Sequence, residues 1–200
     1  MKHLRALTSE KAFTLVELLI VIFLLVALTA MAIFYSSTAE DQVAVFREEG
    51  RVLTALYTAR DMAIETYGKG GVGDVPCAYG IYAATNTVTL FSYHPDVSGQ
   101  CENIFTNTQG PDPSNMTTVS QTMLEGGTIA TNFSSIFFVP PDPRVCVSQN
   151  VGTYSCGQNA FAAFTPCLFV RGIRGSNETV SISVNQFGQI TTDDPSCQQN

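Results

Sequence analysis

The chain has 200 residues and is acidic, with 17 Asp and Glu residues against 10 Lys and Arg residues and a formal net charge of −7. The length suits one domain with an appendage. The acidic residues are spread along the chain, which disfavours nucleic acid as the main partner because a negative surface repels phosphate. With only His3 and His94, the sequence offers neither a Ser/His/Asp triad nor a histidine metal site. We therefore expect no enzymatic activity, no metal and no cofactor.

The N-terminal region has the charge pattern of a membrane anchor. Residues 1–12 carry three basic side chains and one acidic one, which is typical of a cytoplasmic flank. Residues 18–39 are 22 consecutive uncharged residues, and one bilayer crossing needs about 20. We expect a single-pass membrane protein with a cytoplasmic N-terminus and an exported C-terminal part. A secretory signal peptide is the alternative, with "ALTAMA" as its candidate cleavage site.

Residues 40–67 have the pattern of an amphipathic helix. Apolar side chains recur at steps of three and four residues, with Glu48, Glu49, Arg51, Asp61 and Glu65 placed between them. No proline interrupts the pattern, and its weak point is a glycine at position 50, which costs about 1 kcal/mol relative to alanine in a helix. The glycines and proline of "YGKGGVGDVP" end it. We expect one helix over about 13–67, with a membrane or filament-core half at 13–39 and an amphipathic half at 40–67. The apolar positions are Val45, Phe46, Val52, Leu53, Leu56, Ala59, Ala63, Ile64 and Tyr67.

Residues 68–200 alternate short β-rich runs with turn clusters. We expect strands in "AYGIYAA" and "TVTLFSY", joined across Thr85 and Asn86, and in "SSIFFV", "CLFVRGI", "TVSISV" and "GQITT", with "NQFG" turning between the last two. Residues 95–127 lack periodicity and are expected to be irregular. The predicted fold class is therefore α+β, with a long hydrophobic N-terminal helix packed on an exported antiparallel β-sheet domain.

All six cysteines lie in the part of the chain that an anchor would export. An even number in that position favours disulfides over free thiols. The absence of any Cys-x-x-Cys pair disfavours a zinc site. Fifteen pairings are open, and sequential pairing, 77 with 101, 146 with 156 and 167 with 197, is the first expectation. The residues are Cys77, Cys101, Cys146, Cys156, Cys167 and Cys197.

The stretch "KAFTLVELLIVIFLLVALTA" resembles the N-terminal signature of the type IV pilin family, which includes pilins and the pseudopilins of type II secretion. The resemblance covers the leader, the peptidase site and the long helix. It implies that residues 1–12 are a leader removed by a prepilin peptidase, with cleavage between Ala12 and Phe13 and N-methylation of Phe13. The family usually has glycine before the cut. Alanine is the commonest tolerated substitute, so we expect processing to occur.

The resemblance also places a glutamate at the fifth position after the cut, which is Glu17 here. Cleavage would create an α-ammonium group at Phe13, and a carboxylate one helical turn away would offset that charge. The amine could be that of the same chain or, as the resemblance implies, that of a neighbouring subunit during assembly. The alternative is a glutamate that merely extends to the membrane interface.

The resemblance implies a structural subunit, a minor pilin or pseudopilin, of a pilus-like filament or a secretion pseudopilus. Its partners would be the prepilin peptidase/methyltransferase, other pilin or pseudopilin subunits that contact its N-terminal helix, and the membrane. The order of the C-terminal runs is loosely similar to H-type minor pseudopilins. The alternative is a tip-located subunit that binds DNA, a secreted substrate or a surface. For DNA the candidate phosphate contacts are Arg171 and Arg174 in "FVRGIRG".

Overall fold

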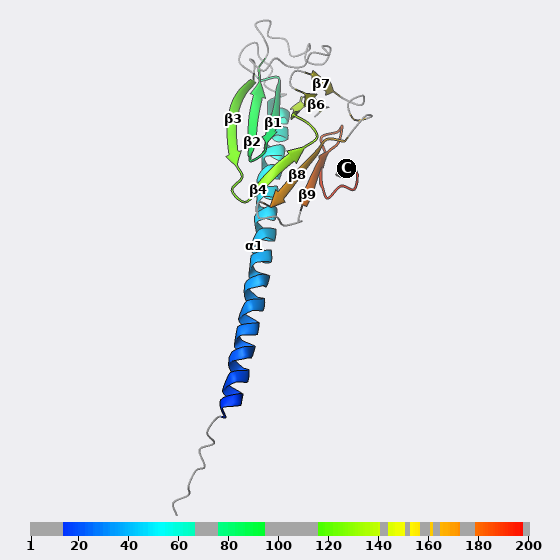
Figure 1. Cartoon of the computed structure of the whole chain (residues 1–200). Helices are drawn as coiled ribbons and strands as arrows, with labels where there is room; N and C mark the ends of the chain where they lie inside the picture. Colours follow the sequence, from blue (N-terminus) through cyan, green and yellow to red (C-terminus); the bar gives the residue numbers. More distant parts are fainter. Residues whose placement is uncertain are drawn as a thin grey trace, which may run out of the picture. The chain divides into compact units, whose positions relative to one another are not determined.

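The computed structural model describes residues 14–66, 76–94, 116–140, 144–150, 153–156, 161, 165–172 and 179–197. In these residues one long α-helix and ten β-strands form (Figure 1), so the predicted α+β class is confirmed. The chain divides into two compact units, Met1–Glu40 and Asp41–Asn200. The first half of the helix belongs to the first unit, and its second half and all the strands belong to the other.

Helix α1 (Leu15–Thr66) is 52 residues long and contains no break. The predicted span of about 13–67 is confirmed for Leu15–Thr66, and Thr14 directly precedes the helix. The helix continues through Gly50, whose carbonyl accepts a hydrogen bond from the Thr54 hydroxyl at 2.7 Å. Apolar side chains fill its first half on all sides, whereas its second half alternates apolar and polar positions.

Six antiparallel strands form the larger sheet, in the order β3-β2-β1-β5-β6-β7. The β1–β2 hairpin turns at Thr85 and Asn86, as predicted, and pairs Ala84 with Thr87. Strand β1 also pairs with β5, so that the hairpin lies at the centre of the sheet. The strands are β1 (Ala78–Ala84), β2 (Thr87–Tyr93), β3 (Met116–Met123), β5 (Ser135–Val139), β6 (Arg144–Asn150) and β7 (Thr153–Cys156).

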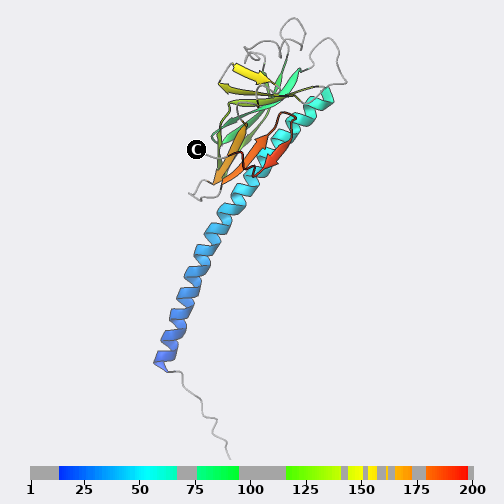
Figure 2. The ribbon, with the colours of Figure 1, turned by 90° about the vertical axis from the view of Figure 1, so that its right-hand side faces the viewer.

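Four antiparallel strands form the second sheet, in the order β10-β9-β8-β4. Figure 2 shows its orange and red strands lying along the part of α1 that belongs to the same unit. The predicted turn between the last two strands is present, because the Gly188 N–H donates to the Asn185 carbonyl at 3.0 Å. The strands are β4 (Gly127–Thr131), β8 (Cys167–Gly172), β9 (Thr179–Val184) and β10 (Ile190–Thr192).

The prediction that residues 95–127 are irregular is wrong for Gly127, the first residue of β4, and for 116–123, which form strand β3. This strand is an edge of the six-stranded sheet and most of its side chains are exposed. An edge strand exposed in this way needs no alternation of apolar and polar residues, so its sequence lacked the pattern that predicts a strand. Residues 95–115 lie outside the described part of the chain.

The core of the second unit lies between α1 and the two sheets. A helical stripe of buried side chains, which includes Val52 and Leu56, packs against Ile81 and Ile136 of the larger sheet and Leu168 of the smaller one. Alternate residues of β5 point to the opposite face, where Phe137 and Val139 form a second cluster with Cys146. Both faces of β5 are therefore buried, which accounts for its uninterrupted apolar sequence.

Two disulfides are described, and both agree with sequential pairing. Cys146–Cys156 joins β6 to β7, and Cys167–Cys197 joins the start of β8 to the segment after β10. Cys77 is also disulfide-bonded. Its expected partner, Cys101, lies outside the described residues.

Candidate functional site

The start of α1 brings Thr14 and Glu17 together. Thr14 directly precedes the helix, and its hydroxyl oxygen accepts a hydrogen bond from the Glu17 backbone N–H at 3.3 Å. Thr14 is therefore the N-cap and Glu17 the third helical residue, the two positions of a capping box. The Glu17 side chain is exposed. A carboxylate at this position also interacts favourably with the positive end of the helix dipole.

The predicted processing site immediately precedes this cap. Ala12 and Phe13 lie outside the described residues, so cleavage and methylation stay predictions. Glu17 is two helical positions after Leu15, the first residue of α1. In the sequence it is four residues after Phe13.

The first half of α1 presents an exposed apolar surface. Large apolar side chains project from the helix between Leu15, which is 77% exposed, and Tyr35, which is 80% exposed. The most apolar stretch of the helix has no buried residue. The helix is long and apolar enough to cross a membrane. The Thr29 hydroxyl donates to the Leu25 and Val26 carbonyls at 2.9 and 3.0 Å, so this polar group has partners within the helix. Such a surface is stable only when lipid or other apolar helices cover it.

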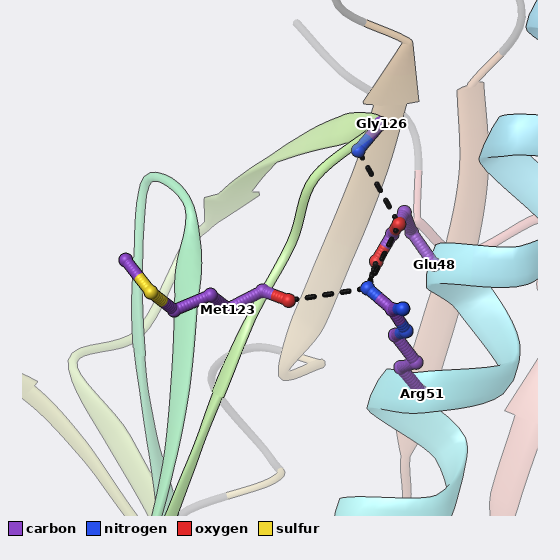
Figure 3. Close-up of polar contacts among 4 residues, drawn as sticks. All are labelled: Glu48, Arg51, Met123 and Gly126. Atoms are coloured by element: carbon purple, nitrogen blue, oxygen red, sulfur yellow. Dashed lines mark hydrogen bonds and ion pairs between the residues drawn. The ribbon is translucent and has the colours of Figure 1, made fainter.

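The second half of α1 contains a buried acid. Glu48 is 1% exposed and lies within the buried stripe, so the expectation that it belongs to the polar face is wrong. Its carboxylate accepts hydrogen bonds from the Gly126 backbone N–H at 3.3 Å and from Arg51 Nη1, which lies 3.2 Å from both oxygens. Arg51 Nη1 also donates to the Met123 carbonyl at 3.2 Å (Figure 3).

Two glycines allow this contact between the helix and the β3–β4 turn. A Cβ atom at Gly126 would lie 3.0 Å from the Ala44 Cβ, and one at Gly127 would lie 3.3 Å from the Glu48 Cγ. The turn backbone therefore lies directly on α1, and the Glu48 carboxylate binds a backbone N–H that a larger residue would keep away. Glu48 and Arg51 connect α1 to the end of β3.

The segment after β10 is held by a second acid. Asp194 accepts hydrogen bonds from the Ser183 hydroxyl at 2.6 Å and from the N–H and hydroxyl of Ser196 at 2.9 and 2.7 Å. These hydrogen bonds hold the pKa of Asp194 below its ordinary value. The negative charge of the adjacent Asp193 acts on Glu49 of α1. Burial, and then the negative charge of Asp193, raise the pKa of the Glu49 carboxyl.

Of the two candidate DNA-contacting arginines, the structure describes only Arg171. Arg171 is an exposed residue near the end of β8 and pairs with Thr128 and Thr179 in the sheet. Arg174 lies outside the described residues. Among the residues that the structure does describe, no group of three His, Cys, Asp or Glu side chains is placed to hold a metal ion.

Comparisons with protein-family models, with curated proteins and with solved structures find no match to this chain. The architecture is nevertheless pilin-like, because a long apolar N-terminal helix continues into a half that packs on antiparallel sheets. Sequence reasoning missed Glu48, Gly126 and Gly127. The available signal was position 48 itself, which lies three residues after Val45 and four before Val52 and so falls on the apolar face.

Proposed function

We propose that this chain is a structural subunit, a minor pilin or pseudopilin, of a type IV pilus-like filament or type II secretion pseudopilus. The observation that carries the proposal is the apolar surface of α1 between Leu15 and Tyr35, exposed on all sides in a helix whose second half is a core element of a disulfide-bonded β unit. A helix with these two halves can be held by lipid in one state and by like helices in another. The proposed role involves no catalysis.

The anchor position follows from the same surface. We propose that the first half of α1 spans the cell membrane with the leader in the cytoplasm, and that the β unit is exported. The disulfides support this location, because they persist in oxidising compartments outside the cytoplasm. When a subunit leaves the membrane for a filament, the helices of neighbouring subunits replace lipid on the exposed surface.

Glu17 has a distinct part in this proposal. An ionised carboxylate costs about 2.5–3.5 kcal/mol at the centre of a membrane-spanning helix on the insertion-derived scale, and less near the helix end, where Glu17 lies. Removal of the leader would supply a compensating charge, the methylated amine of Phe13. We propose that Glu17 pairs with the amine of a neighbouring subunit when that subunit is incorporated, and that this pairing selects correctly processed subunits.

The capping geometry allows the role of the Glu17 charge in assembly to be tested separately from its role in the helix cap. Glutamine is accepted at the third position of a capping box, so Glu17→Gln keeps the cap and removes the charge. We expect Glu17→Gln to be inserted and cleaved normally but to be missing from sheared filaments. Intact-mass analysis of membrane-extracted protein measures loss of residues 1–12 and the added methyl group. Thr14→Ser is the matched control, since it keeps both the cap and the charge. Filaments that contain Glu17→Gln at the wild-type level would refute the assembly role.

A further inference from the structure

The face of the six-stranded sheet opposite to α1 carries a row of uncharged polar side chains. Tyr82 of β1 lies directly opposite Thr89 of β2, and Thr89 lies directly opposite Gln121 of β3. Residues paired in this way have their side chains on the same face of a sheet. Ile81 packs in the core with α1, so the next residue, Tyr82, points to the other face. We call this row the tyrosine patch: Tyr82, Thr89 and Gln121.

Tyr82 is an exposed aromatic side chain in a central strand. It is 45% exposed, although β1 is paired on both sides, with β2 and with β5. Its neighbours on this face of β1 are small, because Gly80 and Ala84 lie two residues before and after it. The residue opposite it on β5 is Ser135, which is also small. The Tyr82 ring is therefore accessible among small side chains.

The three strands that carry the tyrosine patch contain no charged residue. Neither Lys, Arg, Asp nor Glu occurs in β1, β2 or β3, although most side chains of β3 are exposed. A surface that only has to keep a domain soluble carries about 25–35% charged residues. Tyrosine with small hydroxyl and amide side chains is instead the composition of surfaces that bind through stacking and neutral hydrogen bonds. The exposed part of these strands therefore has the chemistry of a recognition surface for an uncharged ligand.

We propose that the tyrosine patch binds a neutral saccharide. The C–H face of a sugar ring suits the face of the Tyr82 ring, and sugar hydroxyls donate and accept hydrogen bonds, as the Thr89 hydroxyl and the Gln121 amide do. None of the three side chains has a hydrogen bond to another described residue, so these groups are available. Neighbouring strands lie about 4.8 Å apart, so the row from Tyr82 to Gln121 is about 10 Å long, enough for a disaccharide.

The surroundings of the patch favour a saccharide over other ligands. Nucleic acid or an acidic glycan would require cations, and β1, β2 and β3 supply none. A protein partner would require an apolar centre. The large apolar side chain nearest to Gln121 along this face of β3 is Met123, at the end of the strand. The patch is complete within one chain, so the inference does not depend on the proposed filament role.

Binding of oligosaccharides to the full chain in lipid nanodiscs tests the proposal. On an array of neutral, sialylated and sulfated oligosaccharides, we expect binding to neutral members. Calorimetric titration with the neutral oligosaccharide that gives the strongest array signal then measures Kd. Tyr82→Thr should raise Kd by about tenfold, because the ring face is lost, and Gln121→Ala by about threefold. Tyr57→Ala is the matched control, because Tyr57 is 44% exposed but lies on α1, and it should leave Kd unchanged.

Several outcomes would overturn the inference. They are binding of acidic oligosaccharides alone, binding of none, and equal Kd values for the wild type, Tyr82→Thr and Gln121→Ala. Gln121→Ala changes an exposed side chain of an edge strand, so it keeps the test decisive if Tyr82→Thr does not fold. Self-association that Tyr82→Thr abolishes, without binding to the array, would assign the patch to another copy of the chain and also overturn the inference. None of these outcomes bears on Glu17, whose role is measured in sheared filaments.

Discussion

Replacement of Glu48 should destabilise the β unit in a way that depends on the group put in its place. Glu48→Ala removes the acceptor of the Gly126 N–H and leaves that donor facing an apolar helix, which costs about 1–3 kcal/mol. Arg51 loses its partner as well, but its side chain is 34% exposed and water can solvate it, so the ionic part adds little. We expect Glu48→Ala to lower the free energy of unfolding by about 2–3 kcal/mol in total. For Glu48→Gln, which keeps an acceptor oxygen, we expect about 1 kcal/mol.

Arg51→Ala is the more severe change of the pair. It leaves the Glu48 carboxylate, 1% exposed, with one hydrogen bond from Gly126 and no cation. An unpaired buried charge costs about 3–5 kcal/mol. Arg51→Ala should therefore lower the free energy of unfolding by more than Glu48→Gln does. The double variant Glu48→Gln/Arg51→Ala should lower it by less than the sum of the two single changes.

Thermal unfolding of the full chain in detergent, followed by near-ultraviolet circular dichroism, measures these differences. For a unit of this size each 1 kcal/mol corresponds to about 2–4 °C in melting temperature. Met123→Ala is the control, since Met123 contributes only its backbone carbonyl to the contact and its side chain is exposed. Equal melting temperatures for Glu48→Ala and Met123→Ala would refute the reasoning.

Three further changes should each alter stability in a defined direction. Gly80→Ala should cost about 1–3 kcal/mol in thermal unfolding, because the added Cβ would lie 2.4 Å from the Phe137 Cβ in the neighbouring strand; an unchanged melting temperature would contradict this. Hydrogen bonds lower the pKa of folded Asp194, so its contribution to stability is present above the ordinary carboxyl pKa and is lost as the pH falls through the lowered one. Asp194→Asn should therefore flatten the acid limb of a plot of stability against pH, and an unchanged limb would exclude this origin. Cys167→Ala/Cys197→Ala removes a disulfide that closes a 30-residue separation and should cost about 3–4 kcal/mol, with the C-terminal segment cleaved first in limited proteolysis; equal protease resistance would contradict that role.

The elements that the sequence predicted are those whose apolar residues follow a regular period, as in α1, or form a continuous run, as in β5. The two strands of the first hairpin coincide with "AYGIYAA" and "TVTLFSY", and α1 agrees over its described length. Strand β3 was missed because an exposed edge needs no such period. Strands β4, β6 and β7 were not predicted either, since the pairings that stabilise them, such as that of Cys146 with Cys156, depend on the fold.

The contact at Glu48 could not be predicted from the neighbouring residues in the sequence, for a different reason. A glutamate on the apolar face of a helix is stable only if donors from elsewhere reach it, and here they come from Arg51 and from Gly126. The sequence reveals neither that the β3–β4 turn lies on α1 nor that Gly126 presents its N–H there. Glu17, by contrast, was located by a motif of adjacent residues, and its capping partner Thr14 lies three positions away.

The distance along the chain between Glu48 and its partner Gly126 is 78 residues, and this sets the order in which the molecule can mature. Helix α1 leaves the ribosome before any strand that covers it. Its buried stripe at Val52 and Leu56 must wait for Leu168 and Ile182, which are made more than a hundred residues later. During that interval the second half of α1 exposes the apolar stripe that later becomes part of the core, and only closure of the β unit buries it.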